Sequence, residues 1–283
     1  MPPSVLLSYF KVSGWHVADI RRECFGGAEV NVFLDCGAFS AQSTGAPINA
    51  HLYEEYVARN APVIDVYVSL DVIGDGEASA VNWRGMRRRG LAPVPTFHVG
   101  DRWALLEEYL EAGGYVALGG LVPYNKRRHW AALWPWLERC MGLAEGRYGA
   151  APVFHAFGIM STVIMDRFRW RSMDSSAASI GARFGSCVVY DRQRHRFVSA
   201  PRDQVPRYAR VIRAMGGDPR HFVPGQPERT RAAMYELAGA SYAASEAVGQ
   251  RTHGPGFRLY LAETDVSPRA YLPFFSGWWR ERG

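Results

Sequence analysis

A regular alternation of short apolar runs with helix-like segments constrains the fold of this 283-residue chain more than any other feature. Eight runs rich in β-branched and aromatic residues predict strands at residues 5–10, 30–35, 64–71, 93–98, 115–120, 152–158, 169–174 and 257–263. Helices are predicted at residues 15–24, 50–60, 80–90, 102–113, 127–141, 161–168 and 241–250. Apolar strands that alternate with helices are typical of a parallel sheet covered by helices. Eight of them favour an α/β fold of the TIM type, a (β/α)8 barrel, over an open doubly wound sheet.

One segment departs from this alternation. Residues 185–201 predict a β-hairpin with a polar turn, and residues 202–249 are largely helical. We therefore expect a single barrel domain over residues 1–283, with an insertion at 185–249 between the seventh and eighth strands. No GxGxxG motif follows the first strand, which counts against a dinucleotide-binding fold.

The chain is basic, with a net charge of +6 and a pI of about 9.2. Nearly all of the positive charge is arginine, which suits contacts to phosphates and bases. Attraction to a polyanion such as nucleic acid would explain the positive charge. A solvated basic surface is an alternative explanation of the charge, and the codon bias of a GC-rich genome is an alternative explanation of the arginine content. Arg192, Arg194 and Arg196 lie in the predicted insertion and make it a candidate nucleic-acid clamp.

The four cysteines are scattered and form no CxxC pair, so we expect neither a zinc knuckle nor a disulfide framework. The N-terminus lacks the basic and apolar regions of a signal peptide. No apolar run approaches the ~20 residues of a membrane span. We expect a cytoplasmic protein, in the host cytoplasm if a phage encodes it, that does not bind membranes.

Polar and small residues gather where the predicted strands end, which is where barrel enzymes carry their active sites. In chain order these are Asp35, Asp71, His98, Gly119, Gly120, Leu121, His155, Gly158 and Asp174. Carboxylates held close in a partly dry pocket repel, so the pKa of at least one should rise. Such a pair suits one carboxylate as nucleophile and another as general acid.

Each of these residues also has an ordinary structural explanation. An aspartate at a strand end commonly caps the next helix, and Asp174 directly precedes two serines. Asp71 would then only turn the chain, and His98 and His155 would be hydrogen-bonded interior histidines. The whole set at matching strand ends favours a site over these separate explanations.

The motifs resemble those of the tRNA-guanine transglycosylases, and especially of their phage and bacterial relatives, the DpdA-type DNA 7-deazaguanine transglycosylases. LDCGAFS resembles the family's Asp-Ser-Gly-Gly-Phe/Tyr-Gln motif, and VSLD resembles its second aspartate strand. ALGGL matches the Gly-Gly-Leu motif, HAFGIMS resembles the Gly-x-Gly strand, and RWRSMDSS resembles the strand that carries the catalytic aspartate. The resemblance extends from residue 5 to about residue 179, with the motifs in the family's order.

The resemblance implies a base-exchanging glycosyltransferase that replaces guanine in double-stranded DNA by a free 7-deazaguanine, a queuosine-related base such as 7-cyano-7-deazaguanine. Asp174 matches the nucleophile that attacks C1′, and Asp35 matches the general acid and base. Phe39 matches the aromatic ring that stacks on the base, Asp71 the carboxylate that reads its edge, and Gly120 the backbone donor to its exocyclic oxygen. His98 falls near a base-reading glutamine and His155 near an apolar stacking position. The target base must flip out of the duplex, and no cofactor is required.

The chain departs from the family at several positions. The tRNA enzymes carry a CxCxxC…His zinc site after the catalytic strand, where this chain has only Cys187, so we expect no metal site. Ala38 and Ser40 replace a glycine and a glutamine of the first motif. In the tRNA enzymes the zinc subdomain supports a dimer. Because this chain lacks the zinc motif, its oligomeric state stays open.

Three alternatives remain. The same pocket would serve a tRNA-guanine transglycosylase or a nucleoside hydrolase. A barrel that has lost catalysis would only bind nucleic acid. An unrelated hydrolase would use His98, His155 and aspartates to hold a metal ion, although no HxH follows the first strand.

Overall fold

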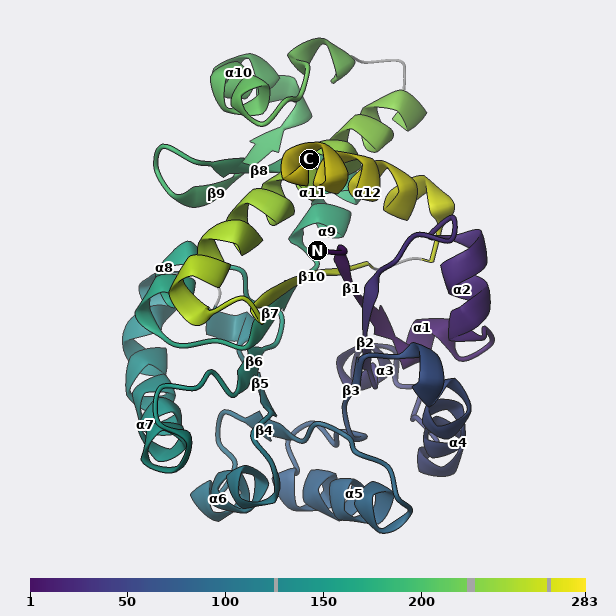
Figure 1. Ribbon diagram of the computed structural model, residues 1–283, viewed down its shortest axis with the longest axis vertical. Coiled ribbons are helices and arrows are strands. Elements are labelled where there is room, and N and C mark those ends of the chain that lie inside the picture. The colour runs from purple at the N-terminus through teal and green to yellow at the C-terminus, as the bar shows by residue number, and fades with distance from the viewer. Residues whose placement is uncertain (125–126, 223–226, 264–265) are drawn as a thin grey trace.

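The computed structural model describes residues 1–124, 127–222, 227–263 and 266–283. Eight strands form one parallel sheet in the order β3-β2-β1-β10-β7-β6-β5-β4 (Figure 1). They are β1 (Ser4–Ser8), β2 (Asn31–Asp35), β3 (Val66–Tyr67), β4 (Thr96–His98), β5 (Val116–Gly119), β6 (Phe154–Ala156), β7 (Ser172–Ser175) and β10 (Arg258–Ala262). The predicted α/β fold and all eight predicted strands are confirmed.

The sheet curls, and its two edge strands approach each other without forming a ladder. One isolated parallel bridge joins Val68 and Val94 in the described chain. Val94 N donates to Tyr67 O (2.8 Å), and Ser69 N donates to Val94 O (2.9 Å). Backbone groups of neighbouring strand residues face opposite sides, so Pro95 next to Val94 faces the other neighbour: its carbonyl oxygen accepts from Ala117 N on β5 (2.8 Å). Because one isolated bridge is not a ladder, the sheet is open between β3 and β4, and the fully closed ring that the sequence predicted is not present.

Helices cover the outer side of the curled sheet (Figure 1). The helices of the described residues, including those that do not contact the sheet, are α1 (Tyr9–Val12), α2 (Val17–Glu23), α3 (Ala38–Thr44), α4 (Ala50–Asn60), α5 (Gly76–Arg88), α6 (Trp103–Ala112), α7 (Trp130–Tyr148), α8 (Thr162–Arg167), α9 (Ala177–Phe184), α10 (Val205–Ala214), α11 (Pro227–His253) and α12 (Pro268–Arg282). Short 3₁₀ turns are η1 (Ala61–Val63), η2 (Val122–Tyr124), η3 (Arg127–His129), η4 (Arg202–Gln204) and η5 (Pro219–His221). All seven predicted helices are present.

Side-chain caps set the start of several helices. The Asn49 side chain accepts from Leu52 N to begin α4, and Asp75 accepts from Ala78 N to begin α5. Ser267 caps α12 by accepting from Arg269 N, with Pro268 at the first helical position. Each cap satisfies an N–H that has no partner inside its helix, which stabilises the helix by about 1 kcal/mol.

The inner face of the curled sheet is packed with aromatic rings. Phe33 lies 4.5 Å from the His155 ring, 5.3 Å from Tyr260 and 5.8 Å from Phe157, measured between ring centroids. Phe33, His155 and Tyr260 are almost fully buried, so they form the floor beneath the carboxyl ends of the strands.

The chain between β7 and β10 contains the predicted hairpin, β8 (Ser186–Asp191) and β9 (Arg196–Pro201), followed by α10, η5 and α11. The hairpin and α10 lie beyond α11 and α12, outside the ring of strands (Figure 1). Tyr190 N on β8 donates to Ser241 Oγ on α11 (3.0 Å), which fixes the hairpin to the outer helix layer. Among the described residues, no helix is both long and apolar enough to cross a membrane.

Candidate active site at the carboxyl ends of the strands

The carboxylates predicted at the strand ends lie at one edge of the sheet, because all eight strands are parallel. Asp35 is the last residue of β2, and its Oδ2 accepts from Gly37 N (3.0 Å). Gly37 has a φ of +81°, and a Cβ at this position would overlap with Ser8 and Phe10. A glycine is therefore required for the turn that brings the N–H back to Asp35.

The three carboxylates influence one another electrostatically. Burial, followed by the negative charges of Asp71 and Asp174, raises the pKa of Asp35 to about 7. The backbone N–H groups of Gly37 and Cys36 oppose this rise. Asp35 therefore exchanges protons near neutral pH, as a group that acts as both acid and base must.

Asp71 lies beside His98, with Oδ2 3.7 Å from His98 Nε2. Burial raises the pKa of Asp71 to about 6, although the His98 imidazole and the Thr96 hydroxyl lower it. Burial also lowers the pKa of His98, but Asp101 and Asp71 outweigh this effect and the pKa of the imidazole is raised. Asp101 holds this arrangement: its Oδ2 accepts from His98 N (2.8 Å) and lies 3.6 Å from Nδ1.

The Gly-Gly turn after β5 makes room for His98. A Cβ on Gly119 would lie 2.6 Å from His98 Nε2, so only glycine allows the ring to occupy this place. Gly120 is exposed, with a φ of +73°, and Leu121 behind it is buried. The backbone of Gly120 is thus accessible to a ligand at the mouth.

Asp174 belongs to β7 and its side chain is only 6% exposed. Its Oδ1 accepts from Gly158 N (2.7 Å) and lies 3.3 Å from His155 Nε2. The other ring nitrogen, Nδ1, lies 2.6 Å from Ser172 Oγ, which in turn is 2.6 Å from the Tyr115 hydroxyl. A buried chain of polar groups thus extends from Asp174 into the interior and holds its carboxylate in one orientation.

The helix-capping explanation fails for Asp71 and Asp174. Helix α5 after Asp71 is capped by Asp75, and α9 after Asp174 begins at Ala177, where the N-cap residue Ser176 makes no side-chain cap. Ser175, not Asp174, accepts from Ala177 N (3.0 Å). Neither carboxylate is used to start a helix.

Phe39 is 65% exposed on the short helix α3, directly after the Asp35 turn. Val72 after β3 and Val122 after β5 are also exposed. These apolar side chains follow strand ends, so the edge that carries the carboxylates also offers apolar surface to a ligand.

The arginines of the predicted clamp lie on the β8–β9 hairpin, away from the carboxylates. Arg192 forms an ion pair with Glu281, and Arg194 Nη1 lies 3.2 Å from Asp191 Oδ2. Arg196 is exposed and has no carboxylate partner among the described residues. Two of the three cations are therefore engaged within the chain.

Several residues of the site were not predicted. Asp101 follows His98 at a spacing of three within the turn after β4, a spacing that brings side chains together. Glu263 directly follows β10, so the rule that found the other carboxylates also applies to it. Ser172 and Tyr115 had no sequence signal, because their link to Asp174 exists only through the buried His155.

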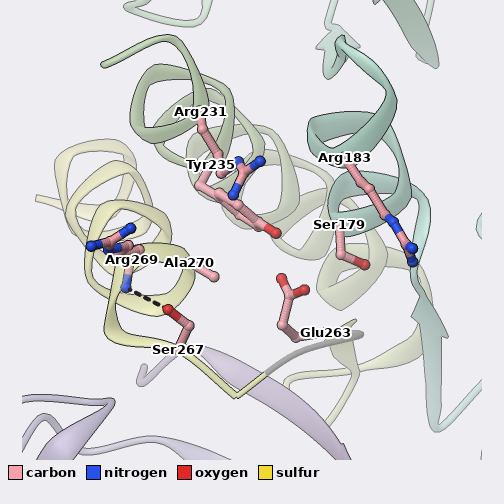
Figure 2. A pocket seen from close by; sticks show the side chains of 8 residues that line it. All are labelled: Ser179, Arg183, Arg231, Tyr235, Glu263, Ser267, Arg269 and Ala270. Carbon is pink, nitrogen blue, oxygen red and sulfur yellow. Dashed lines mark hydrogen bonds between the residues drawn. The ribbon is translucent and has the colours of Figure 1, made fainter. Parts of the chain in front are cut away.

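A pocket of about 380 Å³ lies next to this edge and is lined by Glu263, by Ser267 and by residues of α9, α11 and α12. Figure 2 shows these side chains. Within the described ranges, no group of three or more His, Cys, Asp or Glu side chains is arranged to hold a metal ion. No protein-family model matches this sequence, and no curated protein matches it.

Proposed function

We propose that the protein is a base-exchanging transglycosylase that replaces guanine in DNA by a 7-deazaguanine, through a covalent intermediate on Asp174. The observation that carries the proposal is that Asp35, Asp71 and Asp174 share one strand edge but have different partners. Carboxylates in contrasting environments are what a nucleophile and a general acid require. We also regard the curled sheet, with its Val68–Val94 bridge, as a (β/α)8 barrel with an incomplete ladder.

Asp174 suits the nucleophile, because Gly158 N and His155 Nε2 both approach Oδ1. We therefore assign the attack on the substrate to Oδ2. His155 is completely buried, so it is a positioning residue behind Asp174 and does not touch the base.

Asp35 suits the proton transfer, because its pKa of about 7 allows it to give and to take a proton at neutral pH. In the first step an Asp174 oxygen forms a bond to C1′, the glycosidic bond to guanine breaks, and Asp35 protonates the leaving base. In the second step Asp35 takes a proton from the incoming base, whose nitrogen attacks C1′ and releases Asp174. The bonds balance, so neither an oxidant nor ATP is needed.

Base recognition falls to Asp71, Gly120 and Phe39. A guanine-type edge has N1–H and N2–H₂ donors and an O6 acceptor, which a carboxylate and a backbone N–H complement. The exposed Phe39 ring offers a stacking surface, and stacking stabilises a bound base by about 1–3 kcal/mol. The basic charge of the chain supports a polyanionic substrate.

The test is incorporation of a labelled 7-deazaguanine into duplex DNA and, in parallel, into tRNA. Asp174→Ala should lower the rate by at least about 10³-fold and abolish a covalent adduct between protein and nucleic acid. Asp203→Asn, which removes an exposed carboxylate on η4, is the control and should leave the rate unchanged. Full activity of Asp174→Ala would contradict the assignment of the nucleophile.

The same assay separates the alternatives. Exchange in tRNA alone would reassign the substrate, and base release without an incoming base would indicate a hydrolase. Absence of an adduct with every nucleic acid and base tested would leave a binding module.

A further inference from the structure

The pocket in Figure 2 contains three arginines, Arg183, Arg231 and Arg269, against one described carboxylate, Glu263. Arg231 and Tyr235 extend from α11 on one side, Ser179 and Arg183 from α9 on the other, and the Glu263 carboxylate lies between them (Figure 2). Three helices thus bring positive charge to one cavity. Its volume of about 380 Å³ is near the lower end of the range for small-molecule sites.

The guanidinium groups are available for a ligand. Among the described residues, neither Arg183 nor Arg231 has a carboxylate partner. Arg269 Nη1 lies 3.2 Å from Glu228, but both side chains are about four-fifths exposed, at 78% and 82%. Such exposed pairs are worth at most about 1 kcal/mol, so an anion can displace Glu228.

The pocket adjoins the proposed active site through the strands themselves. Tyr260 on β10 pairs with Asp174 on β7, and Glu263 comes three residues later. Three residues of extended chain span about 10 Å. Ser179 on α9 likewise follows shortly after Asp174, and its Oγ lies 3.0 Å from Ala262 O. The pocket therefore lies on the outer side of the same strand ends, about one or two nucleotides from the nucleophile.

We propose that this pocket binds a backbone phosphate of the nucleic-acid strand, close to the nucleotide whose base is exchanged. Arginine is suited to this contact, because its planar guanidinium donates to two phosphate oxygens at once. The region after the last two strands of a parallel barrel, at the start of a helix, also favours anions, and here Ser267 and Pro268 begin the 15-residue helix α12.

The surface next to the pocket can accept a longer strand. Arg231 and Arg269 also line a second hollow of about 600 Å³, which runs over the starts of α11 and α12 beside Pro227, Pro268 and Leu272. The two arginines lie between these hollows, so a phosphate held by them would have its neighbouring nucleotide in either one. That the ligand is a nucleic-acid strand rests on the proposed function. That the pocket binds a phosphate group depends only on the residues that line it.

The experiment measures how the affinity for a labelled duplex oligonucleotide depends on salt. Arg183→Gln combined with Arg231→Gln should weaken binding about tenfold and lower the slope of log affinity against log salt by about 1. The matched control combines Arg59→Gln on α4 with Arg88→Gln on α5. It makes the same change in net charge at two exposed positions outside the insertion, without carboxylate partners among the described residues, and it should leave the slope unchanged. In the exchange assay the pocket variant should raise KM and leave kcat unaltered, because a phosphate held equally in ground and transition states affects binding only.

A slope equal to that of the control would overturn the proposal. A second arm measures the thermal shift caused by inorganic phosphate. Stabilisation by free phosphate that depends on the two arginines, with an unchanged duplex slope, would assign the pocket to a small phosphorylated ligand and would also overturn it. A lower slope without any base exchange would support the pocket and refute the proposed transglycosylase.

Discussion

Burial raises the pKa of a carboxylate at each end of the curled sheet, but the two carboxylates have opposite surroundings. At the start of β10, Glu246 of α11 is fully buried, and its pKa rises to about 7. Its Oε1 lies 3.0 Å from both Arg282 Nη2 and Gln250 Nε2, and its Oε2 accepts from Leu259 N (2.8 Å). At the other end, Asp35 also has a pKa of about 7, but its neighbours are Asp71 and Asp174.

The comparison shows that a raised pKa alone does not identify a functional carboxylate. Glu246 has a cation, an amide and a backbone donor, so its hydrogen-bonding capacity is used within the fold. Asp35 has the backbone donors of Gly37 and Cys36 and two like charges, an arrangement that costs stability. A carboxylate kept in such surroundings without an ion pair to an arginine or lysine is free to act on a ligand.

The largest expected effect is a loss of stability at Glu246, which has no counterpart at Asp35. Arg282→Ala leaves Glu246 buried without its cation, so the free energy of unfolding at pH 8 should fall by about 3–5 kcal/mol. The loss should shrink below pH 7, where Glu246 takes up a proton. Urea denaturation at both pH values measures this difference.

The control is Arg280→Ala on the same helix, whose partner Glu236 is 38% exposed, whereas Glu246 is fully buried. This partly exposed pair should contribute about 1 kcal/mol or less. Equal losses of unfolding free energy in the two variants would show that the burial of Glu246 does not make its ion pair more important for stability.

Asp35→Asn should raise the free energy of unfolding, whereas Arg282→Ala lowers it. A carboxylate whose pKa is higher in the folded protein stabilises the fold below its unfolded pKa, and this stability is lost as pH rises through the folded value. For a rise from 3.8 to about 7 the loss by pH 8 amounts to about 4 kcal/mol. The asparagine keeps an acceptor for Gly37 N, so we expect a gain of up to about 4 kcal/mol at pH 8, little change at pH 4, and loss of base exchange.

Denaturation of wild type and variant from pH 4 to pH 8 tests this prediction. Wild-type stability should decline across the interval, and the variant should show a flatter decline. A variant that is less stable than wild type at pH 8 would contradict the view that Asp35 is strained by its neighbours.

The exchange reaction itself should follow the same pKa values. Asp35 must be protonated to release guanine, so kcat/KM should fall about tenfold per pH unit above pH 7. Asp71 must be ionised to accept base N–H groups, so the rate should also fall below about pH 6. A profile that stays flat to pH 9 would remove Asp35 from the proton transfer.

Much of this arrangement was readable in the sequence, because strand ends in a parallel sheet converge whatever their distance along the chain. This rule predicted that Asp35, Asp71 and Asp174 lie at one edge of the sheet. The same rule applies to Glu263, which directly follows β10 but was not among the predicted site residues. Helix α12 was not predicted although Ser267 and Pro268 are a typical helix start, since Pro273 and five aromatic residues obscure its pattern.

Other features depend on three-dimensional context that no local pattern contains. The open edge between β3 and β4, where one isolated bridge joins Val68 and Val94, depends on how the whole sheet curls. The engagement of Arg192 and Arg194 depends on Glu281, far along the chain, and on the strand end Asp191. Arginine-rich sequence therefore indicated nucleic-acid contact without showing which arginines remain free.

The smallest expected effect concerns the far end of the chain of polar groups behind Asp174. Tyr115→Phe removes the hydroxyl that lies 2.6 Å from Ser172 Oγ, so Ser172 and His155 are held less firmly. We expect a stability loss of about 1 kcal/mol and a decrease of kcat by less than about tenfold, with KM unchanged. Tyr148→Phe is the matched control, because it also removes a hydroxyl that donates within the fold, to Leu110 O, away from Asp174. It should cost similar stability and leave kcat unchanged. Equal kcat values in the two variants would show that the buried chain supports the fold alone, as Arg282 does for Glu246.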